Sequence, residues 1–175
     1  ATYVVTPGEN DVNEDGANFT ADGSQAWLGT GASATGSYLG LRFTGVSIPA
    51  GASITAAHLE VNAVATQWNG IAFEMAAEAA GNSAPFSASA RPSQRTLLAP
   101  RVMHDSDVQW VAGTRYPLED ITALVQSAVQ QPGWAGQTLT TVPNAVTVID
   151  GDQIQFAQRR VNAAESLAGV PGLLA

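Results

Sequence analysis

Alternation of apolar with polar or small side chains recurs along most of the chain. Residues 38–48, 53–64 and 71–79 each place one apolar set on a single face, as expected for strands. The apolar sets are Leu39, Leu41 and Phe43; Leu59, Val61 and Ala63; and Phe73, Met75 and Ala77. The opposite faces carry Gly40, Arg42 and Thr44; His58, Glu60 and Asn62; and Glu74, Ala76 and Glu78. Further strands are expected within 1–6, 138–149 and 153–161. One apolar and one polar face per strand is typical of antiparallel sheets packed face to face.

Residues 117–134 follow a helical period instead. Apolar side chains recur at i, i+3, i+4, i+7 and i+8, at Ile121, Leu124, Val125, Ala128 and Val129. We expect an amphipathic helix of about three turns, with Glu119 and Asp120 at its positive end and Pro132-Gly133 ending it. The predicted fold class is all-β: an antiparallel β-sandwich (jelly roll) with one short amphipathic helix, forming a single domain over residues 1–175.

Composition and charge argue against several classes of function. The chain has 175 residues, a formal charge of −8 and a pI near 4.4, and all 7 basic residues are Arg. An acidic surface repels phosphates, which argues against nucleic acid and anionic membranes as partners. There is no Cys, so thiolate chemistry and disulfides are excluded. No leader is recognisable, and a start at Ala1 fits either a cleaved leader or removal of an initiator Met from a protein that was not exported.

The stretch DVNEDGANFTAD matches the oxygen spacing of a calcium loop. Asp11, Asn13, Asp15 and Asp22 occupy its positions 1, 3, 5 and 12. It is no EF-hand, because strands and not helices are expected on both sides, and Asn18 stands where an aliphatic residue belongs. Two interpretations remain: a structural calcium held mainly by Asp11, Asn13 and Asp15, or an acidic surface loop.

The sequence shows no catalytic constellation. There is no G-x-S-x-G elbow and no H-E-x-x-H spacing. His58 is expected on the polar face of a strand, and His104 in a loop with Asp105 and Asp107. Alternation on a solvated face accounts for Glu60, Glu74 and Glu78 without a glycosidase site. The chain is therefore predicted not to be an enzyme.

Two sets of residues are candidates for binding. Trp68, at an expected loop tip, with His58, Glu60 and Asn62 on the polar strand face, would form a ligand groove. Trp110 and Trp134 are instead expected in the core. Arg91, Arg95 and Arg101 punctuate a segment with little regular pattern, and they indicate either intramolecular pairing with carboxylates or a docking surface for an acidic partner.

Two stretches carry a resemblance to a known family. LGLRFTGVSIPAGASITAAHLEV and WVAGTRYPLEDITALVQSAVQQPGW resemble a jelly-roll module of the DNRLRE type, similar to carbohydrate-binding modules. Such modules occur in secreted bacterial proteins and in virion proteins of marine phages. The resemblance spans roughly residues 25–170 and implies a scaffold without a reaction. The chain departs from the family pattern in ending at GVPGLLA, almost before the expected last strand, which puts that edge strand in doubt.

Two functions follow as expectations. The first is a virion surface protein, such as a phage capsid decoration or cement subunit, whose partners are other virion proteins or itself in a symmetric oligomer. The second is a secreted, extracellular carbohydrate-binding module whose partner is a polysaccharide.

Overall fold

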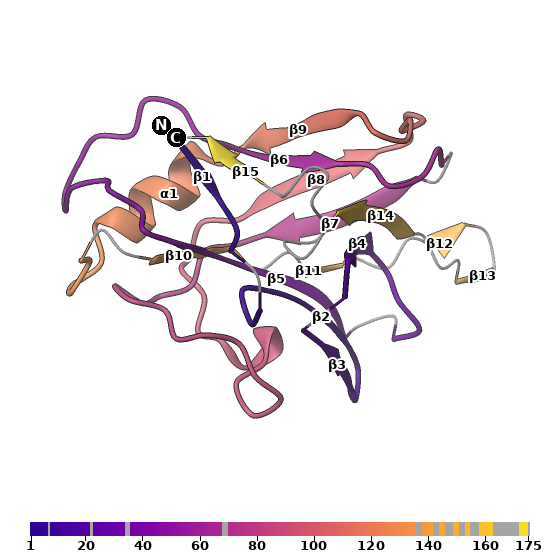
Figure 1. The fold of residues 1–175 in the computed structure, drawn as a ribbon, viewed down its shortest axis with the longest axis horizontal. Coiled ribbons are helices and arrows are strands. Elements are labelled where there is room, and N and C mark those ends of the chain that lie inside the picture. The colour runs from indigo at the N-terminus through magenta and orange to yellow at the C-terminus, as the bar shows by residue number, and fades with distance from the viewer. Residues whose placement is uncertain are drawn as a thin grey trace.

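Antiparallel strands make up most of the structure. The computed structural model describes residues 1–6, 8–21, 23–33, 36–67 and 70–135, and beyond these the backbone of the strands named below. All strand pairs in this part are antiparallel, and its single α-helix is α1 (Thr122–Val129) (Figure 1). The predicted all-β class with one short helix is confirmed. Within the described residues, no helix has the length and apolar character needed to cross a membrane.

The strands form two larger sheets and two small pairs. The four-stranded sheet has the order β1 (Thr2–Val4), β15 (Gly172–Leu174), β6 (His58–Asn62), β9 (Arg115–Asp120). The seven-stranded sheet has the order β3 (Asn18–Thr20), β2 (Asp11–Asp15), β5 (Ser37–Thr44), β11 (Asn144–Ala145), β7 (Ile71–Met75), β8 (Val102–Ser106), with β10 (Thr138–Thr141) also pairing with β5. The small pairs are β4 (Gln25–Gly29) with β14 (Gln158–Asn162), and β12 (Ile149–Asp150) with β13 (Gln153–Ile154).

The apolar faces of both larger sheets meet in one core. All nine residues assigned to apolar faces are buried: Leu39, Leu41 and Phe43 of β5, Leu59, Val61 and Ala63 in and after β6, and Phe73, Met75 and Ala77 in and after β7. Trp110 and Trp134 are buried in the same cluster, as predicted. The period-two pattern therefore identified the inward faces correctly.

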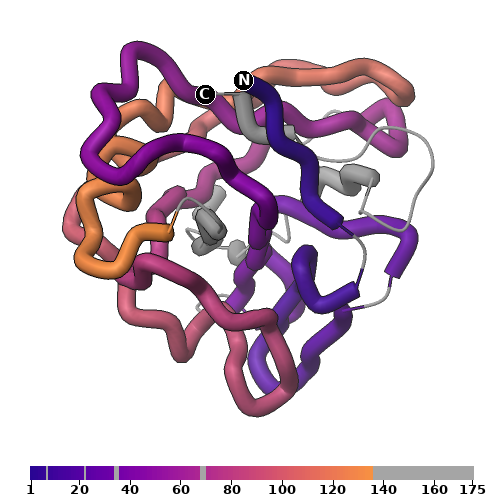
Figure 2. The backbone as a smooth tube through the Cα atoms, turned by 60° about the vertical axis from the view of Figure 1, so that its left-hand side comes forward, coloured from indigo at the N-terminus to yellow at the C-terminus, as the bar shows by residue number. Residues whose placement is uncertain are grey.

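The outer face of the seven-stranded sheet was expected to be solvated, but a segment of the chain crosses it. Residues 82–101, which include a short 3-10 helix η1 (Pro92–Gln94), cross this face, and we call them the strap. Figures 1 and 2 show the strap as a pink loop below β5 and β2. Ala76, expected to face solvent, is buried on this side. Gly40 is buried against Phe86 of the strap, since a Cβ at Gly40 would lie 2.7 Å from the Phe86 ring.

The helix is shorter than predicted and its acidic residues have other places. It spans 8 residues, with the predicted stripe Leu124, Val125, Ala128 and Val129 buried. Glu119 and Asp120 belong to β9 and not to the helix. Asp120 still serves the helix start, because its Oδ1 accepts a 2.8 Å hydrogen bond from the Thr122 backbone N–H. The strand conformation continues to Asp120 because β9 pairs with β6 up to that residue.

The C-terminal strand lies inside the four-stranded sheet. The sequence left the last edge strand in doubt. In the structure β15 pairs with β1 on one side and with β6 on the other. All three of its residues pair with a residue on each side. Leu174, for example, lies opposite both Thr2 and His58. The last strand is thus short and central.

Candidate functional site

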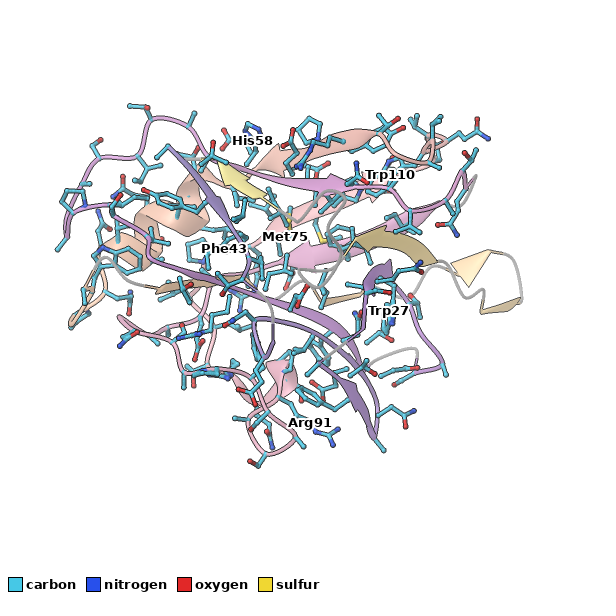
Figure 3. All side chains as sticks on the ribbon, viewed as in Figure 1. Trp27, Phe43, His58, Met75, Arg91 and Trp110 are labelled. Atoms are coloured by element: carbon cyan, nitrogen blue, oxygen red, sulfur yellow. The ribbon has the colours of Figure 1, made fainter. Side chains whose placement is uncertain are left out.

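The outer face of the four-stranded sheet carries the predicted ligand residues. His58, Glu60 and Asn62 lie on the side of β6 opposite to the buried Leu59 and Val61. The register of β6 with β9 then places three further residues beside them: Asp120 opposite His58, Pro117 opposite Glu60, and Arg115 opposite Asn62. In Figure 3 His58 lies at the upper surface of the molecule, away from the core residue Phe43. We call these six residues the open face. Asn62, predicted to line a ligand groove, is buried, whereas His58 and Glu60 are half-buried and Arg115, Pro117 and Asp120 are exposed.

Hydrogen bonds and one ion pair order the side chains of the open face. Glu60 Oε2 lies 3.3 Å from Arg115 Nη1, and the Arg115 side chain is 46% exposed. Asn62 Nδ2 donates to the Gly113 carbonyl at 3.1 Å. An exposed pair of this kind contributes at most about 1 kcal/mol to stability, so its main effect is to fix the positions of two opposite charges.

Asp120 is the second carboxylate of this face. It accepts hydrogen bonds from the hydroxyl and the backbone N–H of Thr122. These two hydrogen bonds, in that order, hold the pKa of Asp120 below its ordinary value, and the charge of nearby His58 lowers the pKa further. The carboxylate is therefore negative at neutral pH.

His58 and Asp120 both line a shallow depression. Its volume is about 290 Å³, and its lining is Ala56, Ala57, His58, Pro117, Leu118 and Asp120. A register shift between His58 and Glu60 marks a β-bulge at this point. An imidazole and a carboxylate beside a small apolar floor can hydrogen-bond a polar ligand. They do not supply the nucleophile, base and oxyanion donors that acyl transfer requires.

The fourth predicted ligand residue and one predicted metal ligand cannot be placed. Trp68 and Asp22 both lie outside the described residues. Sequence reasoning missed Arg115, Pro117 and Asp120, which enter the site through strand register. The bulged register with β6 was the missing information, because alternation within β9 does not reveal which residue faces His58.

The predicted calcium segment is a β-hairpin and not a loop. β2 pairs with β3 across a turn at Gly16, whose φ of 59° suits glycine. Asn13 bonds to the Trp27 backbone twice, its Oδ1 accepting from the N–H at 2.9 Å and its Nδ2 donating to the carbonyl at 2.9 Å. Asp15 accepts from the N–H groups of Ala32 and Ser33 at 2.8 and 2.7 Å.

These bonds give the segment a structural role. Asn13 joins β2 to β4, and Asp15 fixes the turn before β5. Asp11 is buried on the same strand. Among the described residues there is no group of three or more His, Cys, Asp or Glu side chains arranged to hold a metal ion.

His104, expected in a loop, is a buried residue of β8. Its Nδ1 lies 2.6 Å from Glu119 Oε2 of β9, so the pair links the two larger sheets. The ring contacts Phe73, with centroids 4.7 Å apart, and the buried Nε2 has no hydrogen-bond partner among the residues that the structure describes. A ligand could not reach this nitrogen, which favours a structural role for His104.

The described contacts of the three strap arginines are intramolecular. Arg95 pairs with Glu78 at 3.2 Å, with both side chains about nine-tenths buried (9% and 10% exposed). Arg101 pairs with Glu74 at 3.1 Å, and Arg91 donates to the carbonyls of Gly16 and Ala17. Of the two interpretations that the sequence left open, these contacts favour intramolecular pairing over a docking surface.

Comparison with known proteins leaves the chain without an assigned family. No protein-family model matches it, and a search of curated proteins gave no significant match.

Proposed function

We propose that the chain is a non-catalytic jelly-roll module that attaches to a larger assembly as a surface subunit of a phage virion, in the manner of a capsid decoration or cement protein. The observation that carries the proposal is the difference between the two outer faces. The strap covers the seven-stranded sheet and draws Arg95 inward. The four-stranded sheet keeps an open face with an ordered Glu60–Arg115 pair and the Asp120 carboxylate.

The open face suits attachment in many copies better than tight binding by a single copy. Paired, exposed charges orient a partner and raise the association rate more than they add affinity. A repeating lattice offsets weak single contacts, because each bound copy raises the effective concentration of the next. The resemblance to phage virion modules is a further support, at the level of the scaffold.

Two observations test the virion proposal. Genes for capsid and tail proteins beside the coding sequence would support it, whereas a polysaccharide-degrading cluster would contradict it. Sedimentation velocity is expected to show a symmetric oligomer formed by the purified chain. A monomer that binds one glycan on an array would overturn the proposal.

The depression between His58 and Asp120 supports a second candidate, a secreted carbohydrate-binding module. A polar sugar edge would hydrogen-bond the imidazole and the carboxylate while its ring covers Pro117. Under this alternative, His58→Ala and Asp120→Asn abolish binding to the glycan found on an array. Asp105→Asn, at an exposed carboxylate on β8 of the other sheet, is the matched control and leaves glycan binding unchanged.

A further inference from the structure

Three exposed residues follow one another along the open side of β9, and we call them the β9 row. They are Arg115, Pro117 and Asp120. In the register with β6 they lie opposite every second residue of that strand: Asn62, Glu60 and His58. Alternate residues of a strand are about 6.8 Å apart. The register shift between His58 and Glu60 takes up the extra residue of β9, so Arg115 and Asp120 lie at about equal distances on either side of Pro117.

The two ends of the β9 row carry opposite charges. The Arg115 side chain is 46% exposed, and its Nη1 lies 3.3 Å from Glu60 Oε2. A guanidinium has several N–H donors, so Arg115 can hold a second carboxylate as well. At the other end, both described hydrogen bonds from Thr122 end on Oδ1 of Asp120, and Oδ2 can accept from a further donor. The row therefore has a positive end, an apolar centre and a negative end.

The β9 row is complementary to itself in one orientation. A two-fold axis that lies in the plane of the open face, runs across the strands and passes through Pro117 exchanges the two ends of the row. Arg115 of one copy then faces Asp120 of a second copy, this contact occurs twice, and Pro117 faces Pro117. An axis along the strands would instead place Arg115 opposite Arg115. Charge complementarity thus selects the axis across the strands.

A second copy can also cover the residues that lie along this axis. Glu60, Gly172 and Val4 are in register with Pro117 across β6, β15 and β1, which are neighbouring strands in Figure 1. Val4 is 51% exposed, and Gly172 has no side chain. Face-to-face contact would bring Val4 and Pro117 against their counterparts and remove apolar surface from water. The Glu60 carboxylate remains beside Arg115.

We propose that the partner of the open face is a second copy of the chain, bound face to face across a two-fold axis through Pro117. Arg115 of each copy bridges its own Glu60 and Asp120 of the other copy. The contact is isologous, because the same residues serve on both sides. This dimer is the symmetric oligomer expected of the proposed virion subunit, and it rests on that proposal for its biological role.

Complementation between two charge variants tests the orientation. Arg115→Glu makes both ends of the β9 row negative, and Asp120→Arg makes both ends positive. Each variant alone would face like charges at both contacts, so sedimentation velocity should show association weakened by about tenfold or more. In an equimolar mixture, both contacts of the mixed dimer again join opposite charges. The mixture should therefore associate within about threefold of the unmodified chain.

A matched control and two contrary outcomes make the test decisive. Asp105→Arg changes an exposed carboxylate on β8 of the other sheet, so its mixture with Arg115→Glu should show no such recovery. If the mixture of Arg115→Glu and Asp120→Arg associates no better than either variant alone, the proposed orientation is wrong, and an oligomer of the unmodified chain uses another surface. If the unmodified chain is a monomer, both the dimer and the oligomer expected of a virion subunit are wrong.

Cross-linking through a single thiol keeps the proposal testable if Asp120→Arg, which removes the acceptor of the Thr122 hydrogen bonds, folds poorly. The chain has no Cys, so Pro117→Cys places its only thiol on the proposed axis. Facing sheets lie about 10 Å apart, a gap that a short bismaleimide spans. Pro117→Cys should form the covalent dimer about fivefold faster or more than Met103→Cys, whose position on the other sheet is 47% exposed. Equal rates for the two variants would overturn the proposal.

Discussion

At the scale of single residues, Gly40 explains how closely the strap approaches the sheet. Phe86 is fully buried and packs on the β5 backbone, where a side chain at position 40 would overlap its ring. Gly40 was assigned to the polar face because alternation describes one strand at a time. Its lack of a side chain makes room for an aromatic ring from a segment more than forty residues away.

Gly40→Ala is therefore expected to destabilise the protein. The added Cβ would lie 2.7 Å from the Phe86 ring, and such overpacking costs about 1–3 kcal/mol of the free energy of unfolding. Urea denaturation measures the change. Gly70→Ala is the control, because a Cβ at Gly70 meets no described atom within 4 Å, and its effect should stay within about 0.5 kcal/mol. Equal stabilities for the two variants would contradict the proposed contact.

Asp120 gives a prediction for the pH dependence of stability. Its pKa in the folded protein is below the ordinary value of 3.8, chiefly because Thr122 donates two hydrogen bonds to the carboxylate. A lowered pKa means that the charged form stabilises the fold above about pH 4, and that this stabilisation is lost as the pH falls through the folded-state pKa. Asp120→Asn should therefore be less stable than the unmodified chain at neutral pH, and the difference should shrink in acid. Denaturant unfolding from neutral to strongly acidic pH checks this, and a difference that grows in acid would refute it.

At the scale of elements, two side-chain amides substitute for strand pairing. Asn13 bonds to both backbone groups of Trp27 and so attaches β4 to β2. Gln126 of α1 does the same for the segment before β6, accepting from the Ile54 N–H and donating to the Ala52 carbonyl, each at 2.9 Å. Both contacts join segments that are not paired as strands in the described structure. The local sequence pattern does not predict either contact.

Asn13→Ala should loosen β4 from β2. The change leaves the Trp27 N–H and carbonyl without their partners, a loss of about 1–3 kcal/mol for buried groups. Hydrogen exchange at the Trp27 amide should accelerate more than exchange in β6. An unchanged Trp27 rate would show that Asn13 does not hold this strand.

The same contacts set an expectation for calcium. A calcium ion at Asn13 and Asp15 would compete with hydrogen bonds that already engage the Asn13 carboxamide and the Asp15 carboxylate. We therefore expect the melting temperature to be unchanged by added calcium or by a chelator. A calcium-dependent rise would instead restore the structural calcium site predicted from the spacing of Asp11, Asn13 and Asp15.

The elements also show what the sequence can and cannot predict. Alternation identified the buried faces of β5, β6 and β7, because burial on one side of a strand imposes a period of two. The apolar stripe of α1 was predicted in the same way, because burial on one side of a helix imposes a period of about 3.6 residues. The strap was not visible, because its segment has no regular period and its contacts, both the polar ones and the packing of Phe86 on Gly40, join residues distant in sequence. His104 was misplaced because its strand is short and alternates weakly, so that Asp105 and Asp107 suggested a loop.

At the scale of the whole molecule, the five arginines whose side chains the structure describes divide unequally between internal and external roles. Arg95 lies between strap and sheet, and Arg42 reaches carbonyl and amide oxygens at the same junction. Arg115 stands on the open face and is 46% exposed. The proposed attachment surface of an acidic protein therefore includes a basic side chain, ordered by Glu60, beside the Asp120 carboxylate. A partner that binds this face must therefore present groups that complement both the positive Arg115 and the negative Asp120.

Charge reversal at two arginines separates attachment from stability. Arg115→Glu places a like charge beside Glu60 on the open face, so it should weaken oligomer formation by about tenfold or more while changing the free energy of unfolding by no more than about 1 kcal/mol. Arg95→Glu buries a second carboxylate beside Glu78 and should cost about 3–5 kcal/mol of the free energy of unfolding. Sedimentation velocity reports the first effect and urea denaturation the second. If Arg115→Glu assembles like the unmodified chain, the open face is not the attachment surface, even if the protein proves to be a virion subunit.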